Sequence, residues 1–281
     1  MSLSVQLCKQ LNQLFPKPVH PFNLANKGEK TYAEWQFERG EATIQFYLAF
    51  ANKEEMFNGK NILDIGCGAG GKTLYYATLG ANHVYGVDVE PHYRQEAEVL
   101  AKSKGLEDKS TFLTADAIDL PFENNSIDTI LMNDAMEHVD QPIAVLKECY
   151  RILKQGGRLY VNFPPYYHPY GAHLSDVIGI PWVHSFFSDQ TLIDVYKDLV
   201  SNLPDGEGRI NFRIGKKESG KEYFSYINKM TIRRFESIKK AVPFHIRYEH
   251  HEPLRPFLSA PSRFPWFKEY LVKMVVCVFE K

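Results

Sequence analysis

In the middle of the chain, short runs of hydrophobic residues alternate with segments in which hydrophobic residues recur at helical spacing. Short apolar runs predict strands at 62–65, 83–87, 111–115, 127–132 and 158–163. Between them, apolar residues with helical spacing predict helices at 73–79, 95–104 and 142–153, each with glycine at or just beyond its end. Strands that alternate with helices in this way predict an α/β fold with a doubly wound parallel sheet, whose ligands bind at the carboxyl ends of the strands.

The segments before and after this central region also have spacings that predict helices and strands. Residues 5–15 predict a short helix, and the prolines that follow predict an irregular arm. Residues 31–50 have helical spacing with Thr31 as N-cap and an interruption at Gly40, which predicts two helices or one kinked helix. Helical spacing returns at 189–203 and 231–241, and β-prone runs occupy 244–250 and 270–279.

The segment from Asn61 to Asp88 reads as a strand, a glycine-rich turn, a helix and a second strand that ends on aspartate. Such a βαβ unit holds nucleotide-like ligands, and we expect an adenosine compound here. Three sequence patterns fit the turn. They are a phosphate loop (Gly66, Gly71, Lys72, Thr73), a dinucleotide loop (Gly66, Gly68, Gly71, with Asp88), and the pattern D-x-G-x-G-x-G (Asp64, Gly66, Gly68, Gly70).

The third pattern resembles the first motif of the class I S-adenosylmethionine-dependent methyltransferases. Asp64 favours it, because a carboxylate beside the turn repels phosphates but pairs with the ammonium group of a methionine moiety. The strand Thr129 to Asp134 keeps the phosphate alternative open, since it resembles the strand and aspartate that hold Mg²⁺ in nucleotide triphosphatases. No separate catalytic group for a dehydrogenase is evident.

The resemblance covers roughly residues 60–165, through LDIGCGAG, GVDVE, TADAIDLPFENNSIDTILMNDAMEHV and KECYRILKQGGRLYV. These segments are similar to the small-molecule branch of the family, of methyltransferase type 11. The resemblance implies S-adenosylmethionine as cofactor and a Rossmann-like seven-stranded sheet with an antiparallel last strand. It also implies that Asp64 contacts the methionine end, Asp88 the ribose hydroxyls, and Asp116 with the Ala117 amide the adenine. The remaining cofactor-binding candidates are Gly66, Cys67, Gly68, Gly70, Val89, Asn133 near the sulfonium, and His138.

Each candidate also has a purely structural interpretation. Asp88 and Asp116 are placed where aspartate often caps a following helix, and Asn133 is nearly as compatible with a structural role. Two carboxylates beside a glycine turn nevertheless favour ligand contact.

Residues 1–58 are expected to form an N-terminal arm and helical cover, and 59–281 the methyltransferase domain, with 164–243 as a substrate-side insertion. In the cover, Tyr32, Trp35 and Arg39 would either lie over the cofactor or pack against the sheet edge. The proline-rich connection 164–187 would roof the acceptor site. Its histidines His173, His168 and His184 are the candidates for a catalytic base, because histidine titrates near neutral pH.

Composition and charge give information on the cellular location of the protein and on its binding partners. A net charge of −1 without runs of like charge argues against a nucleic-acid partner. The four scattered cysteines favour reduced thiols in a cytoplasmic protein. The longest apolar run, Met274–Phe279, is too short to span a bilayer.

The sequence therefore predicts an S-adenosylmethionine-dependent methyltransferase for a small acceptor, at a hydroxyl oxygen and without a metal. An aromatic content of 14% suggests an apolar or ring-bearing acceptor. Two alternatives remain, a Mg²⁺-dependent nucleotide hydrolase or kinase that uses Lys72 and Thr73, and an inactive cofactor-binding subunit. The proline-rich segment 252–266 has no assigned role.

Overall fold

The computed structural model describes residues 2–281, and this part of the chain forms two compact units. The sheet unit consists of residues 30–163, 232–252 and 274–281, and the accessory unit of residues 2–29, 164–231 and 253–273. This grouping divides the chain differently from the boundary expected at residue 58. Residues up to 29 group with the connection that follows the fifth strand, whereas residues 30–58 group with the sheet.

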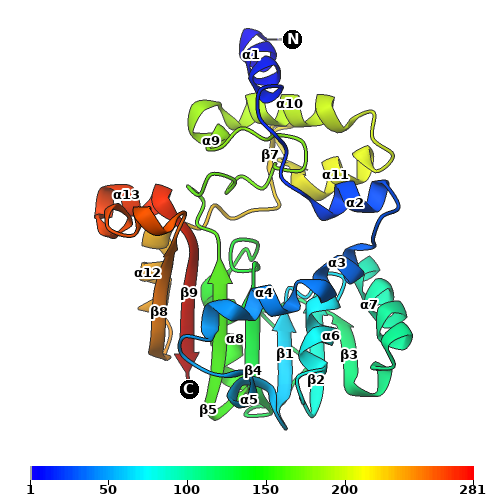
Figure 1. The fold of residues 1–281 in the computed structure, drawn as a ribbon, viewed down its shortest axis with the longest axis vertical. Coiled ribbons are helices and arrows are strands. Elements are labelled where there is room, and N and C mark those ends of the chain that lie inside the picture. The colour runs from blue at the N-terminus through cyan, green and yellow to red at the C-terminus, as the bar shows by residue number, and fades with distance from the viewer. Residues whose placement is uncertain (1) are drawn as a thin grey trace. The chain divides into compact units, whose positions relative to one another are not determined.

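Within residues 2–281, the main sheet has seven strands in the order β3-β2-β1-β4-β5-β9-β8 (Figure 1). The first five strands pair in parallel and β9 pairs antiparallel with β5, which confirms the predicted fold class. The strands are β1 (Asn61–Ile65), β2 (His83–Asp88), β3 (Ser110–Thr114), β4 (Ile127–Asn133), β5 (Leu153–Phe163), β8 (His245–Pro253) and β9 (Val272–Glu280).

One strand begins earlier than its apolar run. β5 starts at Leu153, which pairs with Ile127, so the glycines expected to end the preceding helix lie inside the strand. Gly156 has a φ of +75°, and the pairing register of β4 with β5 shifts between Ile127 and Thr129. The glycines thus mark an irregularity in the ladder rather than a loop before it.

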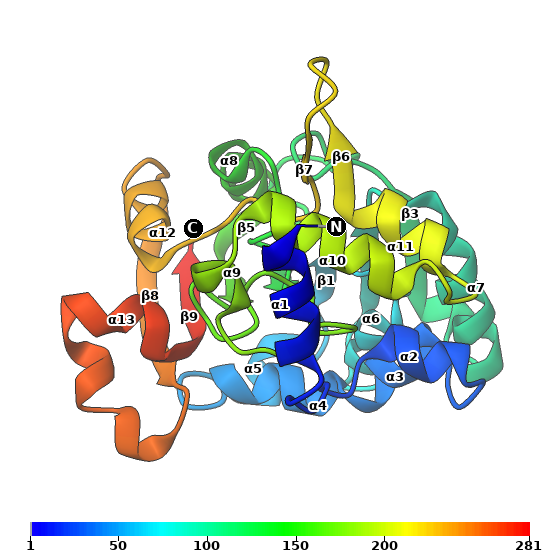
Figure 2. The same cartoon turned by 90° about the horizontal axis from the view of Figure 1, so that it is seen from above.

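Helices cover both faces of the sheet, with α4, α5 and α6 on one side and α8 and α12 on the other (Figure 2). Thr31 caps the first helix of the unit in a capping box with Glu34, as predicted. The predicted break at Gly40 is also present. A Cβ placed on Gly40 would lie 2.3 Å from the Tyr75 ring, so the break allows close packing on α6. The helices of this unit are α3 (Tyr32–Glu38), α4 (Gly40–Ile44), α5 (Lys53–Phe57), α6 (Gly71–Ala77), α7 (Pro91–Lys104), α8 (Pro142–Ile152) and α12 (Ile232–Lys239), with the 3₁₀ turns η1 (Gln45–Tyr47) and η2 (Glu107–Lys109).

The accessory unit is mainly helical. α1 packs across α10 (Figure 2), where Ser4 and Thr191 share a hydrogen bond of 3.2 Å and Lys9 pairs with Asp198. The predicted helices at 5–15 and 189–203 correspond to α1 and α10. The elements of this unit are α1 (Leu3–Asn12), α2 (Pro21–Asn26), α9 (Val183–Phe186), α10 (Asp189–Val200), α11 (Gly206–Arg213), β6 (Ile214–Lys216), β7 (Glu222–Phe224), η3 (Pro256–Leu258), η4 (Pro261–Arg263) and α13 (Pro265–Leu271).

Two predictions for this region were incomplete. Residues 205–221 contain α11 and most of the β6–β7 hairpin, neither of which the sequence had indicated. The strand expected from residue 270 begins at Val272, because residues up to Leu271 belong to α13. The helix starts with Pro265 at its first position, where a missing N–H is tolerated.

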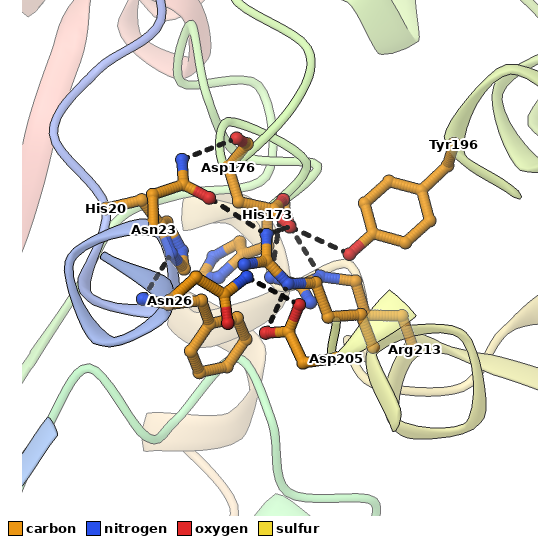
Figure 3. Close-up of polar contacts among 10 residues, drawn as sticks. His20, Asn23, Asn26, His173, Asp176, Tyr196, Asp205 and Arg213 are labelled. Atoms are coloured by element: carbon orange, nitrogen blue, oxygen red, sulfur yellow. Dashed lines mark hydrogen bonds and ion pairs between the residues drawn. The ribbon is translucent and has the colours of Figure 1, made fainter. Parts of the chain in front are cut away.

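A buried charged cluster organises the accessory unit (Figure 3). The Asp176 carboxylate accepts hydrogen bonds from the Tyr196 hydroxyl at 2.9 Å and from Arg209 at 3.0 Å, and Arg213 lies 3.5 Å away. From α2, Asn23 donates to the Asp176 carbonyl and accepts from Arg209. The cluster therefore joins α2, the connection after β5, and α10 and α11. In the described residues, no helix has the length and apolar character needed to cross a membrane.

Candidate active site

The turn between β1 and α6 has a backbone that only glycine adopts easily. Gly66, Gly68 and Gly70 have φ values of +70°, +53° and +75°, in the left-handed region. A Cβ on Gly66 would lie 2.7 Å from the Ala135 Cβ, so the segment after β4 packs closely against this turn. The glycines thus shape a loop at the carboxyl end of β1, which we call the glycine loop (residues 66–70).

Asp88 fixes the glycine loop from the end of the neighbouring strand. Its Oδ2 accepts from the Gly68 amide at 2.8 Å and its Oδ1 from the Glu90 amide at 3.0 Å. Burial raises the pKa of this carboxyl. The Val89 amide also acts on this carboxyl, but a carboxylate offers about four lone-pair positions, so acceptor capacity remains for a ligand. That capacity fits a pair of ribose hydroxyls.

Asp64 lies at the end of β1 and only 2% of it is exposed. It accepts a hydrogen bond of 2.6 Å from the Thr73 hydroxyl. Burial raises the pKa of Asp64 to about 6, although the Thr73 hydrogen bond and the nearby Lys72 act in the opposite direction. A buried carboxylate with one described donor fits a cationic partner such as the ammonium of a methionine moiety.

The residues of the phosphate-loop pattern are held by other protein groups. Lys72 pairs with Asp134 at 2.8 Å, and Thr73 donates to Asp64. The Gly71 amide donates to the Gln36 side chain, at 3.3 Å. A triphosphate would need this lysine and these amides, and it would face two carboxylates, so the geometry disfavours the phosphate-binding alternative.

The carboxylates at the ends of β2 and β3 do not cap helices. Glu90, not Asp88, occupies the N-cap of α7, and the chain turns irregularly after Asp116. Asp116 is exposed and accepts from the Ile118 amide at 3.1 Å. Its neighbour Ala117 is buried. The helix-cap interpretation is therefore wrong for both aspartates, and their contact with a ligand stays a prediction.

Asn133 belongs to a buried hydrogen-bond network at the end of β4. Its carbonyl accepts from the Tyr47 hydroxyl at 2.6 Å and from Asn162 at 2.8 Å, while its amide donates to the Tyr76 hydroxyl at 3.0 Å. Both lone pairs of the carbonyl are occupied. This geometry favours the structural interpretation of Asn133, and its predicted contact with the cofactor stays a prediction.

Helix α3 lies against the glycine loop. Gln36 donates to the Cys67 carbonyl at 3.3 Å, in addition to accepting from Gly71. A Cβ placed on Gly68 would be 3.4 Å from the Tyr32 ring. Burial, with Asp134 and Asp88 nearby, raises the pKa of Tyr32. Tyr32 of the predicted cover thus reaches the loop, and Gln36 is a contact that sequence reasoning missed.

The other candidates near the loop differ in environment. Arg39 is exposed and its guanidinium stacks 4.9 Å from the Trp35 ring centroid, so these two residues contact each other. Burial raises the pKa of the Cys67 thiol well above its usual value. Val89 is 61% exposed directly after β2, and its contact with the cofactor stays a prediction.

The segment after β4 carries a second acidic group. Glu137 is buried, and burial together with Asp134 raises its pKa well above the usual range. His138 Nε2 lies 3.8 Å from Glu137 Oε1. Ala135, two residues before Glu137, lies 2.7 Å from a Cβ placed on Gly66, so the segment that carries this pair approaches the glycine loop. The sequence analysis singled out His138 but not Glu137.

The three histidines predicted as bases lie in the accessory unit. Burial lowers the pKa of His168 and of His184 to about 4. The His184 ring packs against Tyr166, with centroids 4.7 Å apart. His173 has a φ of +54°, and its carbonyl accepts from Arg213 at 3.1 Å. The role of these three histidines as a catalytic base stays a prediction.

Residues 63–161 match the family model of the methyltransferase domain. The chain is 30% identical over 147 residues to tocopherol O-methyltransferase from Arabidopsis thaliana, covering 52% of this chain and 41% of that protein. It is 34% identical to sterol 24-C-methyltransferase from Pneumocystis carinii, over 45% of this chain and 33% of the relative. For norajmaline N-methyltransferase from Rauvolfia serpentina the identity is 32%, over 41% of this chain and 40% of the relative. The chain thus spans less than half the length of these curated relatives.

Solved structures agree in fold. A geranyl diphosphate methyltransferase in complex with S-adenosylmethionine superimposes with a TM-score of 0.53 at 14% identity, covering 87% of this chain and 84% of that one. A methyltransferase from Methanosarcina mazei gives a TM-score of 0.52 at 21% identity, over 81% and 95% of the two chains. The family match identifies residues 63–161 as a methyltransferase domain, for which S-adenosylmethionine is the cofactor, and the solved structures share its fold.

Proposed function

We propose that the chain transfers a methyl group from S-adenosylmethionine to a small apolar or ring-bearing molecule, at a hydroxyl oxygen. The observation that carries this proposal is the glycine loop anchored by Asp88 at the carboxyl ends of β1 and β2. The names of the relatives specify a tocopherol, a sterol and norajmaline as acceptors, with O-, C- and N-methylation. They support a small organic acceptor and leave the methylated atom to experiment.

The cofactor, when bound, supplies an electrophilic methyl group. In our proposal Asp88 binds the ribose hydroxyls, Asp116 with the Ala117 amide binds the adenine, and Asp64 pairs with the ammonium group. The glycine loop brings its backbone close to the ligand. The protein then needs to align the acceptor and exclude water.

A hydroxyl acceptor also needs a group that removes its proton. We propose histidine for this role. His168 and His184 are neutral at pH 7 because their pKa values are lowered to about 4, but the same lowering makes them weak bases. His173 therefore ranks first. His138, beside Glu137, is the remaining candidate.

Cofactor binding is tested by calorimetry with S-adenosylhomocysteine in the absence of metal. We expect binding to the unmodified protein and a loss of about 1–3 kcal/mol for Asp88→Ala, because hydrogen bonds to a charged group are removed. Asp108→Ala is the matched control, since Asp108 is exposed in η2, just before the amino end of β3. Tight Mg²⁺-ATP binding that Lys72→Ala abolishes, with no affinity for S-adenosylhomocysteine, would refute the proposal.

The pH dependence of binding tests the role of Asp64. The carboxyl must be ionised to pair with an ammonium group, and its pKa is about 6. We therefore expect the affinity for S-adenosylhomocysteine to fall as the pH is lowered through 6. Asp64→Asn should remove this dependence and bind more weakly at pH 7. An affinity of the unmodified protein that is constant from pH 7 to 5 would contradict the assignment.

The acceptor is identified by mass spectrometry of the products formed with labelled cofactor from a panel of phenols, alcohols and amines. Each of the four histidines is then changed to Gln and turnover is followed on the true acceptor. A loss of about 10²-fold or more in kcat with cofactor affinity intact marks the base. If no variant slows the reaction, an amine or thiol acceptor replaces the hydroxyl.

An inactive cofactor-binding subunit is the alternative that these experiments also address. It predicts S-adenosylhomocysteine binding without any product across the panel. A cytoplasmic location is part of our proposal and rests on Cys8, Cys67, Cys149 and Cys277, which are buried and form no disulfide within residues 2–281.

A further inference from the structure

Residues 254–271, which we call the aromatic insertion, form a closed loop between β8 and β9. The Leu254 amide donates to the Leu271 carbonyl at 2.8 Å, which joins the two ends of the insertion. Between them lie η3, η4 and α13 (Figure 1). Its sequence had no assigned role, and none of its residues has a part in the proposed chemistry.

Four large aromatic side chains of the insertion are more than half exposed, and a fifth, Tyr270, is 39% exposed. The exposed fractions are 79% for Phe257, 62% for Phe264, 86% for Trp266 and 56% for Phe267. Single exposed apolar residues are normal on a protein surface, but four within eleven residues of sequence are unusual and point to an interaction surface.

The insertion is held in shape rather than loosely exposed. Pro256, Pro261 and Pro265 each restrict the backbone at the start of a helical turn. The Tyr270 ring packs 5.0 Å from the Tyr167 ring, and both residues belong to the accessory unit. A fixed backbone presents the exposed aromatic side chains without a large entropic cost on binding.

Basic residues accompany the aromatic ones. Arg255, Arg263 and Lys268 lie in the insertion, against the single acidic residue Glu269. Arg255 and Arg263 are exposed. Within residues 2–281, none of these three cations has a carboxylate oxygen within 4.0 Å. The insertion thus combines exposed rings with uncompensated positive charge.

We propose that the aromatic insertion docks on an anionic membrane surface. Tryptophan and other aromatic side chains favour the interface between water and lipid, and an anionic leaflet attracts Lys and Arg residues near its surface. The charge argues against a second copy of the same face, because a symmetric contact would bring the same cations together. This inference rests on the proposed function, since a membrane is the place where an apolar acceptor accumulates.

Vesicle sedimentation tests the proposal with the full chain. The protein should sediment with vesicles of equal parts phosphatidylserine and phosphatidylcholine, and much less with phosphatidylcholine alone. Added salt should weaken the binding. Trp266→Ala or Phe257→Ala should lower the partition coefficient about tenfold, as expected for withdrawing one large aromatic side chain from an apolar environment. The matched control Phe186→Ala removes a ring that is 74% exposed in α9 and should change nothing.

A second pair of variants measures how much the positive charge of the insertion contributes to vesicle binding. Lys268→Gln should weaken binding about fivefold, the usual contribution of one cation near an anionic surface. Lys17→Gln, which removes an exposed lysine of the arm, is the control. Absent sedimentation with the anionic vesicles, or equal binding by the Trp266 and Phe186 variants, would overturn the proposal. So would a dimer in sedimentation velocity that Trp266→Ala dissociates.

Calorimetry with S-adenosylhomocysteine on the same samples, without vesicles, separates this inference from the proposed function. The substitutions should leave the cofactor affinity unchanged, which also verifies folding. Vesicle binding without cofactor affinity would refute the methyltransferase proposal alone, whereas cofactor affinity without vesicle binding would refute the docking surface alone.

Discussion

Two glycines with the same backbone conformation offer a direct test of the glycine loop. Gly70 and Gly105 have φ values of +75° and +65° and each adjoins a helix end. Their surroundings differ. A Cβ on Gly70 would lie 2.5 Å from the Ala97 Cβ and 2.6 Å from the Phe112 ring, whereas a Cβ on Gly105 would have no atom within 4 Å. Alanine at both sites therefore separates backbone strain from crowding.

The expected losses in the free energy of unfolding follow from these contacts. The left-handed conformation costs alanine about 1–2 kcal/mol at either site. At Gly70 the new methyl group is about 1 Å closer than an ordinary carbon contact, and such overpacking adds about 1–3 kcal/mol. The gain from restricting the unfolded chain is the same for both variants and cancels. Gly70→Ala should thus be about 1–3 kcal/mol less stable than Gly105→Ala.

Urea unfolding followed by circular dichroism measures the difference, and calorimetry with S-adenosylhomocysteine supplies a second readout. Gly70→Ala should also weaken cofactor binding, because relieving the overlap moves the loop. Gly105→Ala should not, since this residue follows α7 at the amino ends of the strands. Equal stability losses, or unchanged affinity in the Gly70 variant, would refute the reasoning about the loop.

Three further predictions follow from other contacts. Tyr47→Phe removes one donor to Asn133 and should lower stability by about 1 kcal/mol in urea unfolding; no change would mean that the network is not stabilising. The pKa of Glu249 is lowered from 4.5 to about 2 by hydrogen bonds from His251 and Lys239, so it stabilises the fold above pH 4.5 and this contribution disappears towards pH 2. Compared with the unmodified protein, Lys239→Met should be less stable at pH 7 and should lose less stability between pH 5 and 2. An equal loss of stability in the two proteins over this pH range would contradict this. Hydrogen exchange across Tyr32–Glu38 should slow on adding S-adenosylhomocysteine, whereas unchanged exchange would leave α3 as ordinary packing.

The sequence predicted the sheet because buried parallel strands read as continuous apolar runs. Local chemistry also predicted the break at Gly40 and the cap at Thr31, since both depend on residues a few positions apart. The contacts of Gln36 were not predictable in this way. They join α3 to residues 31 and 35 positions further along the chain, and nothing in the local sequence marks a glutamine for that role.

The misjudged element ends have physical causes. Tyr270 and Leu271 continue an apolar run into β9, but Pro265 starts a helix that includes them, so helix geometry prevailed over β-propensity. A second limit concerns the histidines proposed as bases. The low pKa of His168 arises mainly from burial by the surrounding fold, which a sequence pattern does not reveal. The candidate residues at strand ends were predictable, whereas their partners were determined by tertiary packing.

The Asp176 cluster has a consequence for how the chain folds. Asn23 and Arg209 are 186 residues apart in sequence, yet they share a hydrogen bond in the accessory unit. During synthesis, α1 and α2 leave the ribosome before α10 and α11 exist, so they have no native partner until most of the chain has been made. Contacts of such separation form slowly because a long loop must close first. The sheet unit, built largely from neighbouring segments, should therefore fold early, and the accessory unit should be the late and more easily misfolded part of the nascent chain.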